Sequence, residues 1–150
     1  MHCDDLWQYS ARVLRLAFTL AIGTWLGAVI ALTFVVAPTA HERFSTAEAR
    51  RFLRPLFPRL YALGIGCGFF ALGAVLAGKP GLTMGELLRL SLPTAVALLC
   101  TIVGRQTLLP RLAAMEGQDA RFARLHQLST MLNTTTLAAL VLAMAGAIAR

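Results

Sequence analysis

The chain has 150 residues, of which 57% are hydrophobic and 14% are charged, with a mean hydropathy of +0.68. This composition excludes an ordinary soluble domain. The net charge of +7 would fit nucleic acid, but the arginines gather in short segments between apolar runs, which favours anionic lipid and predicts no nucleic-acid partner.

Four uncharged runs divide the chain. They are Leu16–Ala40, Leu60–Gly78, Leu90–Gly104 and Leu128–Ala149. Three are near or above the roughly 18 residues that cross a bilayer as a helix, and the third run reaches that length if Arg89 and Arg105 extend toward the two surfaces. The sequence predicts an all-α, integral membrane four-helix bundle, in one domain over residues 1–150. The predicted spans cover residues 14–38, 58–78, 86–109 and 124–149.

The first predicted span contains two glycines four residues apart, Gly23 and Gly27. Small residues at this spacing let two helix backbones approach closely in lipid, so both glycines are expected at a helix–helix contact. Pro38 is expected to close this helix, because proline lacks the N–H that a helix interior needs.

The first loop is predicted to hold a short interfacial helix. Ser45 and Glu48 have the spacing of a capping box, and Pro55 marks the end of the helix. We expect Phe52 and Leu53 to dip into the membrane while the neighbouring arginines contact lipid phosphates.

The second and third spans are predicted to be antiparallel neighbours because the turn between them is short. Gly64 and Gly68, with Gly66 between them, predict a close-packing surface on the second span. Thr83-Met-Gly-Glu86 predicts a capped start for the third helix, which Pro110 is expected to kink or terminate.

The two halves of the chain share a pattern. Pro38 precedes Arg51-Phe-Leu-Arg54, and Pro110 precedes Arg121-Phe-Ala-Arg124. In each half a span ends in proline, a basic loop follows, and Arg-Phe-x-Arg leads into the next span. The pattern is compatible with two similar helical hairpins related by an axis along the membrane normal, or with a chance match between arginine-rich loops.

Basic residues also predict the orientation. The first and third loops carry nine of them, against five for the N-terminus, second loop and C-terminus together. This imbalance favours loops one and three in the cytoplasm and both termini outside. Thirteen of the fourteen basic residues are arginine, a usage typical of a GC-rich bacterium, so the bacterial cytoplasmic membrane is the predicted location.

The fourth span begins with a polar face. Its members are His126, Ser129, Asn133 and Thr136, with Arg105 expected opposite them at similar depth. Polar groups at this depth need a partner helix, trapped water or a ligand. A structural clamp between helices is favoured over a functional site, because such contacts fix helix register without any chemistry.

Catalytic and metal sites are not predicted. Ser129 lies three residues after His126, but a plain helix supplies no oxyanion hole, so the protein is expected not to be an enzyme. Haem ligation by His41 and His126, or copper binding by Cys67 and Cys100, is kept as a minor alternative, and no cofactor is assigned.

Three segments resemble a known family. They are Trp25-Leu-Gly27 followed by Ala37-Pro38; Leu56-Phe-Pro58 with Tyr61; and Phe122 with Leu125-His-Gln-Leu-Ser129 and Asn133. Together they resemble the transmembrane protein 205-like family, four-span membrane proteins without an assigned biochemical function. The resemblance implies four spans and membrane residence, and it leaves the activity open. Because Thr39-Ala-His-Glu42 departs from the family pattern, no family role is carried onto His41.

These observations lead to a functional expectation. The chain is predicted to be a non-enzymatic membrane module that packs its helices against a second copy of itself or a membrane-protein partner. The alternative is a small transporter or permeation subunit, with Arg105 and the polar face of the fourth span lining a water-filled path.

Overall fold

The computed structural model describes residues 3–113 and 120–149, and this part of the chain consists of helices and short connections without any strand. The α-helices are α1 (Cys3–Ile30), α2 (Ala37–Arg43), α3 (Thr46–Leu53), α4 (Leu56–Ala77), α5 (Met84–Val103), α6 (Leu109–Ala113) and α7 (Ala120–Ile148). The segments η1 (Ala31–Val36) and η3 (Gly104–Leu108) are π-helical, and η2 (Lys79–Gly81) is a 3₁₀ turn.

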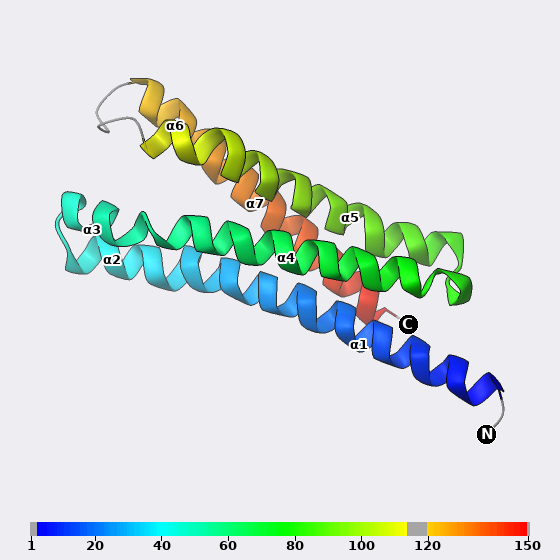
Figure 1. Ribbon diagram of the computed structural model, residues 1–150. Helices are drawn as coiled ribbons and strands as arrows, with labels where there is room; N and C mark the ends of the chain where they lie inside the picture. The colour runs from blue at the N-terminus through cyan, green and yellow to red at the C-terminus, as the bar shows by residue number, and fades with distance from the viewer. Residues whose placement is uncertain (1–2, 114–119, 150) are drawn as a thin grey trace.

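The four long helices form a bundle in which neighbours run antiparallel (Figure 1). α1 packs against α4 and α7, and α5 packs against the same two helices, so α1 and α5 lie diagonally across the bundle. The start of α1, the turn at η2 and the end of α7 lie at one end, while α2, α3 and α6 lie at the other. The predicted all-α four-helix bundle is confirmed.

Pro38 was expected to end its helix, and Pro110 was expected to kink or terminate its own, but neither proline ends a helix. α2 continues α1 through Pro38 to Arg43, and α6 continues α5 through Pro110. Each proline follows a π-helical segment, in which Ala37 N–H donates to Leu32 O, and Leu109 N–H to Gly104 O, five residues back. The wider turn precedes the proline, which then sits at the second position of a new α-helical segment, where its missing N–H is tolerated.

Both predicted capping boxes are present. The Ser45 N–H donates to Glu48 Oε2 at 3.0 Å, and the Thr83 N–H donates to Glu86 Oε2 at 2.9 Å. The first box starts α3 as predicted, but the expected burial of Leu53 in lipid is wrong. Leu53 is buried against the protein, in a small core with Leu32, Ala40 and Ala49, and Phe52 remains exposed beside Phe44.

The two halves of the chain repeat at a spacing of 72 residues. This spacing relates the prolines, the π-helical segments before them and nine pairs of buried residues. The buried pairs are Phe18/Leu90, Ile22/Thr94, Trp25/Ala97, Val29/Thr101, Leu32/Gly104, Gly64/Thr136, Gly68/Leu140, Ala71/Ala143 and Val75/Ala147. The Arg-Phe-x-Arg motifs are 70 residues apart and therefore stand outside this register. The hairpin α1–α4 thus corresponds to the hairpin α5–α7 about an axis that runs along the bundle.

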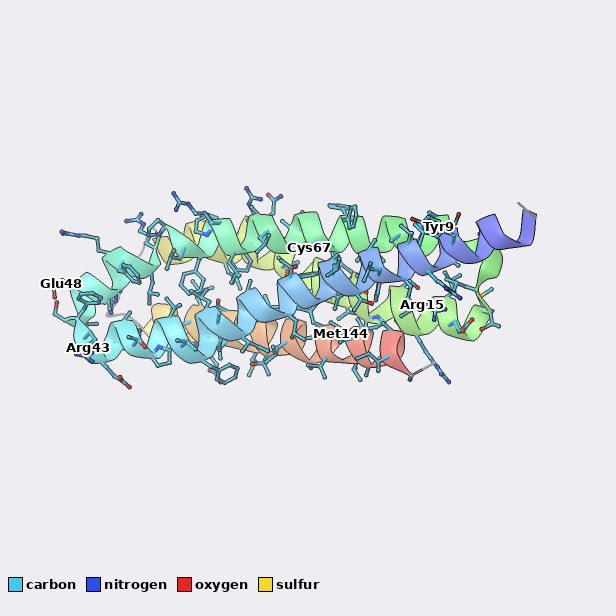
Figure 2. All side chains as sticks on the ribbon, turned by 90° about the horizontal axis from the view of Figure 1, so that it is seen from below. Tyr9, Arg15, Arg43, Glu48, Cys67 and Met144 are labelled. Carbon is cyan, nitrogen blue, oxygen red and sulfur yellow. The ribbon has the colours of Figure 1, made fainter. Side chains whose placement is uncertain are left out.

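The outside of the bundle is apolar over most of its length. Large side chains such as Leu16, Phe69 and Leu142 are more than 60% exposed, and α1, α4, α5 and α7 are all long and apolar enough to cross a membrane. Figure 2 shows Tyr9 and Arg15 toward one end and Arg43 and Glu48 at the other. An apolar surface of this extent is stable against hydrocarbon and not against water, so the chain is a multi-pass membrane protein.

Candidate functional site

The polar face predicted at the start of α7 becomes more buried from His126 toward Thr136. His126 is exposed, Ser129 and Asn133 are half-buried, and Thr136 is 4% exposed. Successive members are three or four residues apart and therefore share one side of the helix. The deeper two point into the bundle, and the shallower two lie toward its basic end.

Asn133 is the member that joins α7 to another part of the chain. Its Nδ2 donates to Thr33 Oγ1 in η1 at 3.0 Å. Ser129 is a hydrogen-bonding neighbour of the Tyr61 side chain on α4. The Thr136 hydroxyl donates to Leu132 O in its own helix at 2.9 Å, as threonines within helices commonly do. The face therefore bonds to η1 and α4, in the manner of a clamp.

Arg105 was expected opposite this face, but the structure places it on the surface. It lies in η3, is exposed, and no polar contact in the described part of the chain joins it to the face. At the 72-residue spacing Arg105 corresponds to Thr33, and Asn133 corresponds to Tyr61. Tyr61, the counterpart of Asn133, packs against η3. Its hydroxyl lies 3.1 Å from the position that a Cβ on Gly104 would occupy.

The glycines predicted for helix packing divide into two groups. A Cβ on Gly64 would meet Trp25 Cε2 at 2.8 Å, and one on Gly68 would meet Leu98 Cδ1 at 2.9 Å, so both glycines pack closely. A Cβ on Gly23 would lie at an ordinary 3.4 Å from Met144 Cε. Gly27 faces away from the bundle and nothing lies within 4 Å of its Cβ position, so no other helix of this chain packs against it.

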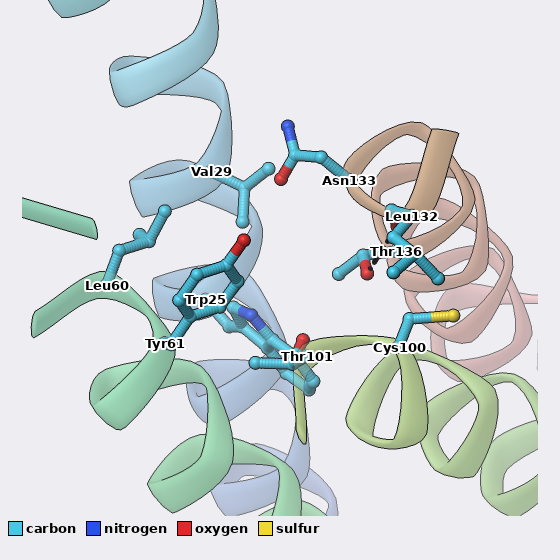
Figure 3. A pocket seen from close by; sticks show the side chains of 9 residues that line it. All are labelled: Trp25, Val29, Leu60, Tyr61, Cys100, Thr101, Leu132, Asn133 and Thr136. Atoms are coloured by element: carbon cyan, nitrogen blue, oxygen red, sulfur yellow. Dashed lines mark hydrogen bonds between the residues drawn. The ribbon is translucent and has the colours of Figure 1, made fainter. Parts of the chain in front are cut away.

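A small cavity lies between the four long helices, under the polar face (Figure 3). Its volume is about 10 Å³, which is the room that one water molecule needs. It is lined by Trp25, Val29, Leu60, Tyr61, Cys100, Thr101, Leu132, Asn133 and Thr136. Three pairs of lining residues are related by the 72-residue spacing, namely Val29/Thr101, Leu60/Leu132 and Tyr61/Asn133, so the cavity lies on the axis of the repeat.

Residues 20–121 match a family described as "Domain of unknown function (DUF4149)". The chain belongs to this family. The DUF4149 match covers the cavity residues of α1, α4 and α5 but ends before those of α7. No curated protein and no solved structure matches the chain. The family description leaves the biochemical role of this four-span membrane domain unassigned.

Among the cavity residues that were not predicted as site residues, three carry polar groups, namely Trp25, Tyr61 and Thr101. Trp25 and Tyr61 contributed to the resemblance alone, and Thr101 lies within an apolar run. Aligning the two halves on their prolines would have placed Tyr61 at the position of Asn133. That signal is present in the sequence of this DUF4149 protein, although the 70-residue spacing of the Arg-Phe-x-Arg motifs obscures it.

The histidines and cysteines considered for haem or copper are dispersed. His41 and His126 are exposed, and Cys67 and Cys100 are half-buried in α4 and α5. Within residues 3–113 and 120–149, no three side chains among His, Cys, Asp and Glu come together as a metal-ion site would require. The side chains that line the cavity are neutral, so they are suited to hydrogen bonding and not to pairing with a charge.

Proposed function

We propose that this protein is a non-enzymatic membrane module that associates with a second copy of itself. The observation that carries the proposal is a set of glycines at which no other helix of the bundle packs. Gly27 on α1, and Gly66 and Gly73 on α4, face outward with no atom within 4 Å of their Cβ positions. Glycine destabilises a helix interior by about 1 kcal/mol relative to alanine, so unused glycines on a lipid-facing surface call for another role.

Outward glycines permit close contact between helices of different molecules. In lipid, helices associate through backbone approach and van der Waals packing, and small residues allow both. Ala62, Gly66, Gly73 and Ala77 lie along the exposed side of α4. A second copy can present the same surface about a twofold axis, which is the commonest symmetry of homo-oligomers.

The experiment replaces Gly66 by leucine and compares it with Ala138→Leu, an exposed small residue on α7. Native mass spectrometry from mild detergent, with crosslinking in native membranes, measures the fraction of dimer. We expect Gly66→Leu to lower that fraction at least about tenfold, because the added side chain separates the backbones. A wild-type chain that is monomeric in both measurements, or equal losses in the two variants, would contradict self-association.

A permeation role ranks second. Membrane transporters built from parallel repeats have their sites between the repeats, where this cavity lies. The cavity has room for about one water, however, and the axis beside it is filled by fully buried side chains such as Ile22, Leu140 and Ala143. The small volume of the cavity and the packed axis beside it therefore give more support to a packing module than to a solute path.

Two finer assignments accompany this proposal. The resemblance at Trp25, Tyr61 and the start of α7 supports membership of the transmembrane protein 205-like family. The excess of arginine in loops one and three supports a bacterial cytoplasmic membrane location with both termini outside.

A further inference from the structure

The cavity on the repeat axis is lined by residues of all four long helices. Trp25, Tyr61, Thr101 and Asn133 each come from a different long helix, and each carries a polar group. The volume of about 10 Å³ is the room that about one water molecule needs. The cavity therefore suits an occupant of the size of water.

The hydroxyl and amide oxygens around the cavity can accept hydrogen bonds. The hydroxyls of Thr101 and Thr136 donate to carbonyls of their own helices at 2.8 and 2.9 Å, which leaves oxygen lone pairs available. Asn133 uses Nδ2 toward Thr33, and in Figure 3 its carbonyl oxygen lies on the side of the cavity. Tyr61 directs its hydroxyl toward the same space (Figure 3). An occupant that donates hydrogen bonds would satisfy these oxygens.

The lining selects against other occupants of similar size. No charged side chain lines the cavity, so an ion would lose its hydration without gaining a counter-charge. An apolar occupant would leave the available lone pairs without donors. We infer that the cavity binds a single water molecule, which donates hydrogen bonds to oxygens of both hairpins. This site lies inside the bundle and is independent of the association proposed for its outer face.

The direct test is a density map of the full chain in lipid nanodiscs or crystals that resolves ordered water. The expected result is one isolated peak within about 2.7–3.2 Å of at least two of the oxygens of Tyr61, Thr101, Asn133 and Thr136. An empty cavity would overturn the inference. Density continuous with a lipid or detergent chain would overturn it as well.

A matched pair of threonines on α5 provides a second test. Thr94 and Thr101 are both buried, and each donates to the carbonyl four residues back, at 2.7 and 2.8 Å, but only Thr101 lines the cavity. Valine has the same shape as threonine without the hydroxyl. We expect Thr101→Val to lower the midpoint of thermal unfolding by at least about 2–4 °C more than Thr94→Val, because the bound water loses a partner.

Equal shifts for the two variants would show that Thr101 stabilises the fold only through its own helix, and would overturn the inference. If Thr101→Val does not fold, Thr136→Val takes its place, since its hydroxyl bonds within α7 in the same way and also lines the cavity. The density map of the folded variant should then show the peak weakened or lost.

Discussion

Gly64 and Gly66 lie two residues apart on α4 and have opposite surroundings. The Cβ position of Gly64 is 2.8 Å from Cε2 of Trp25, a residue that is 1% exposed, whereas Gly66 faces open space. We expect Gly64→Ala to destabilise the protein by about 1–3 kcal/mol through overpacking. Gly66→Ala should be neutral or stabilising by up to about 1 kcal/mol, because alanine favours the helix.

Unfolding in detergent, followed by helical circular dichroism, measures both changes. A Gly64→Ala protein as stable as the wild type would mean that Trp25 can be displaced, and the close contact between α1 and α4 would lose its assigned role.

For single residues, the sequence predicted which residue types matter better than it predicted which way each residue faces. Asn133 and Thr136 were predicted to face a partner and do so, because three- and four-residue spacings fix one helix face. Whether Gly27 or Gly64 turns inward could not be predicted, since that depends on how each helix is rotated against its neighbours. Trp25, which occupies the space above Gly64, is the residue that distinguishes the two glycines.

The short helix α3 depends on its cap more than the long helix α5 does. α3 has 8 residues and α5 has 20, and each begins at a capping box, with Ser45 and Thr83 at the N-cap positions. Removing an N-cap side chain costs about 0.5–2 kcal/mol. We expect Ser45→Ala to accelerate amide hydrogen exchange throughout α3 by about 2- to 30-fold.

Thr83→Ala is the control, and its effect should be confined to the first turn of α5, because the rest of that helix packs against α4 and α7. Mass spectrometry of exchanged peptides resolves the two regions. Unchanged exchange across α3 in Ser45→Ala would show that packing of Ala49 and Leu53 alone holds this helix.

The elements themselves were largely predictable because their causes are local. Uncharged runs of sufficient length predicted the four spans, and residues three apart predicted both capping boxes. The helix ends near Pro38 and Pro110 were not, because proline normally stops a helix and the sequence gives no separate signal for a π-helical turn before it. The register between the hairpins is given by the two prolines, but the Arg-Phe-x-Arg motifs indicate a different one, and the buried pairs of the structure decide between them.

The bundle has one basic end and one end that carries both termini. Exposed arginines of α2, α3, η3 and α6 lie at the first, and the start of α1 and the end of α7 lie at the second. We expect the basic end in the cytoplasm. A membrane-impermeant maleimide should therefore label Cys3 in intact cells, and a Cys3→Ser, Ala47→Cys protein only after permeabilisation. The reverse pattern would invert the orientation.

Each π-helical segment contains one residue more than the same turn of an α-helix would. One extra residue rotates the residues after it by about 100° about the helix axis. An insertion in one half alone would have rotated Ala40 away from α3 while leaving the other half in place. Both halves carry the extra residue at matching positions, so their twofold relation is preserved. The matched insertions therefore keep the segments after the two prolines, α2 in one half and α6 in the other, at equivalent rotations about the bundle axis.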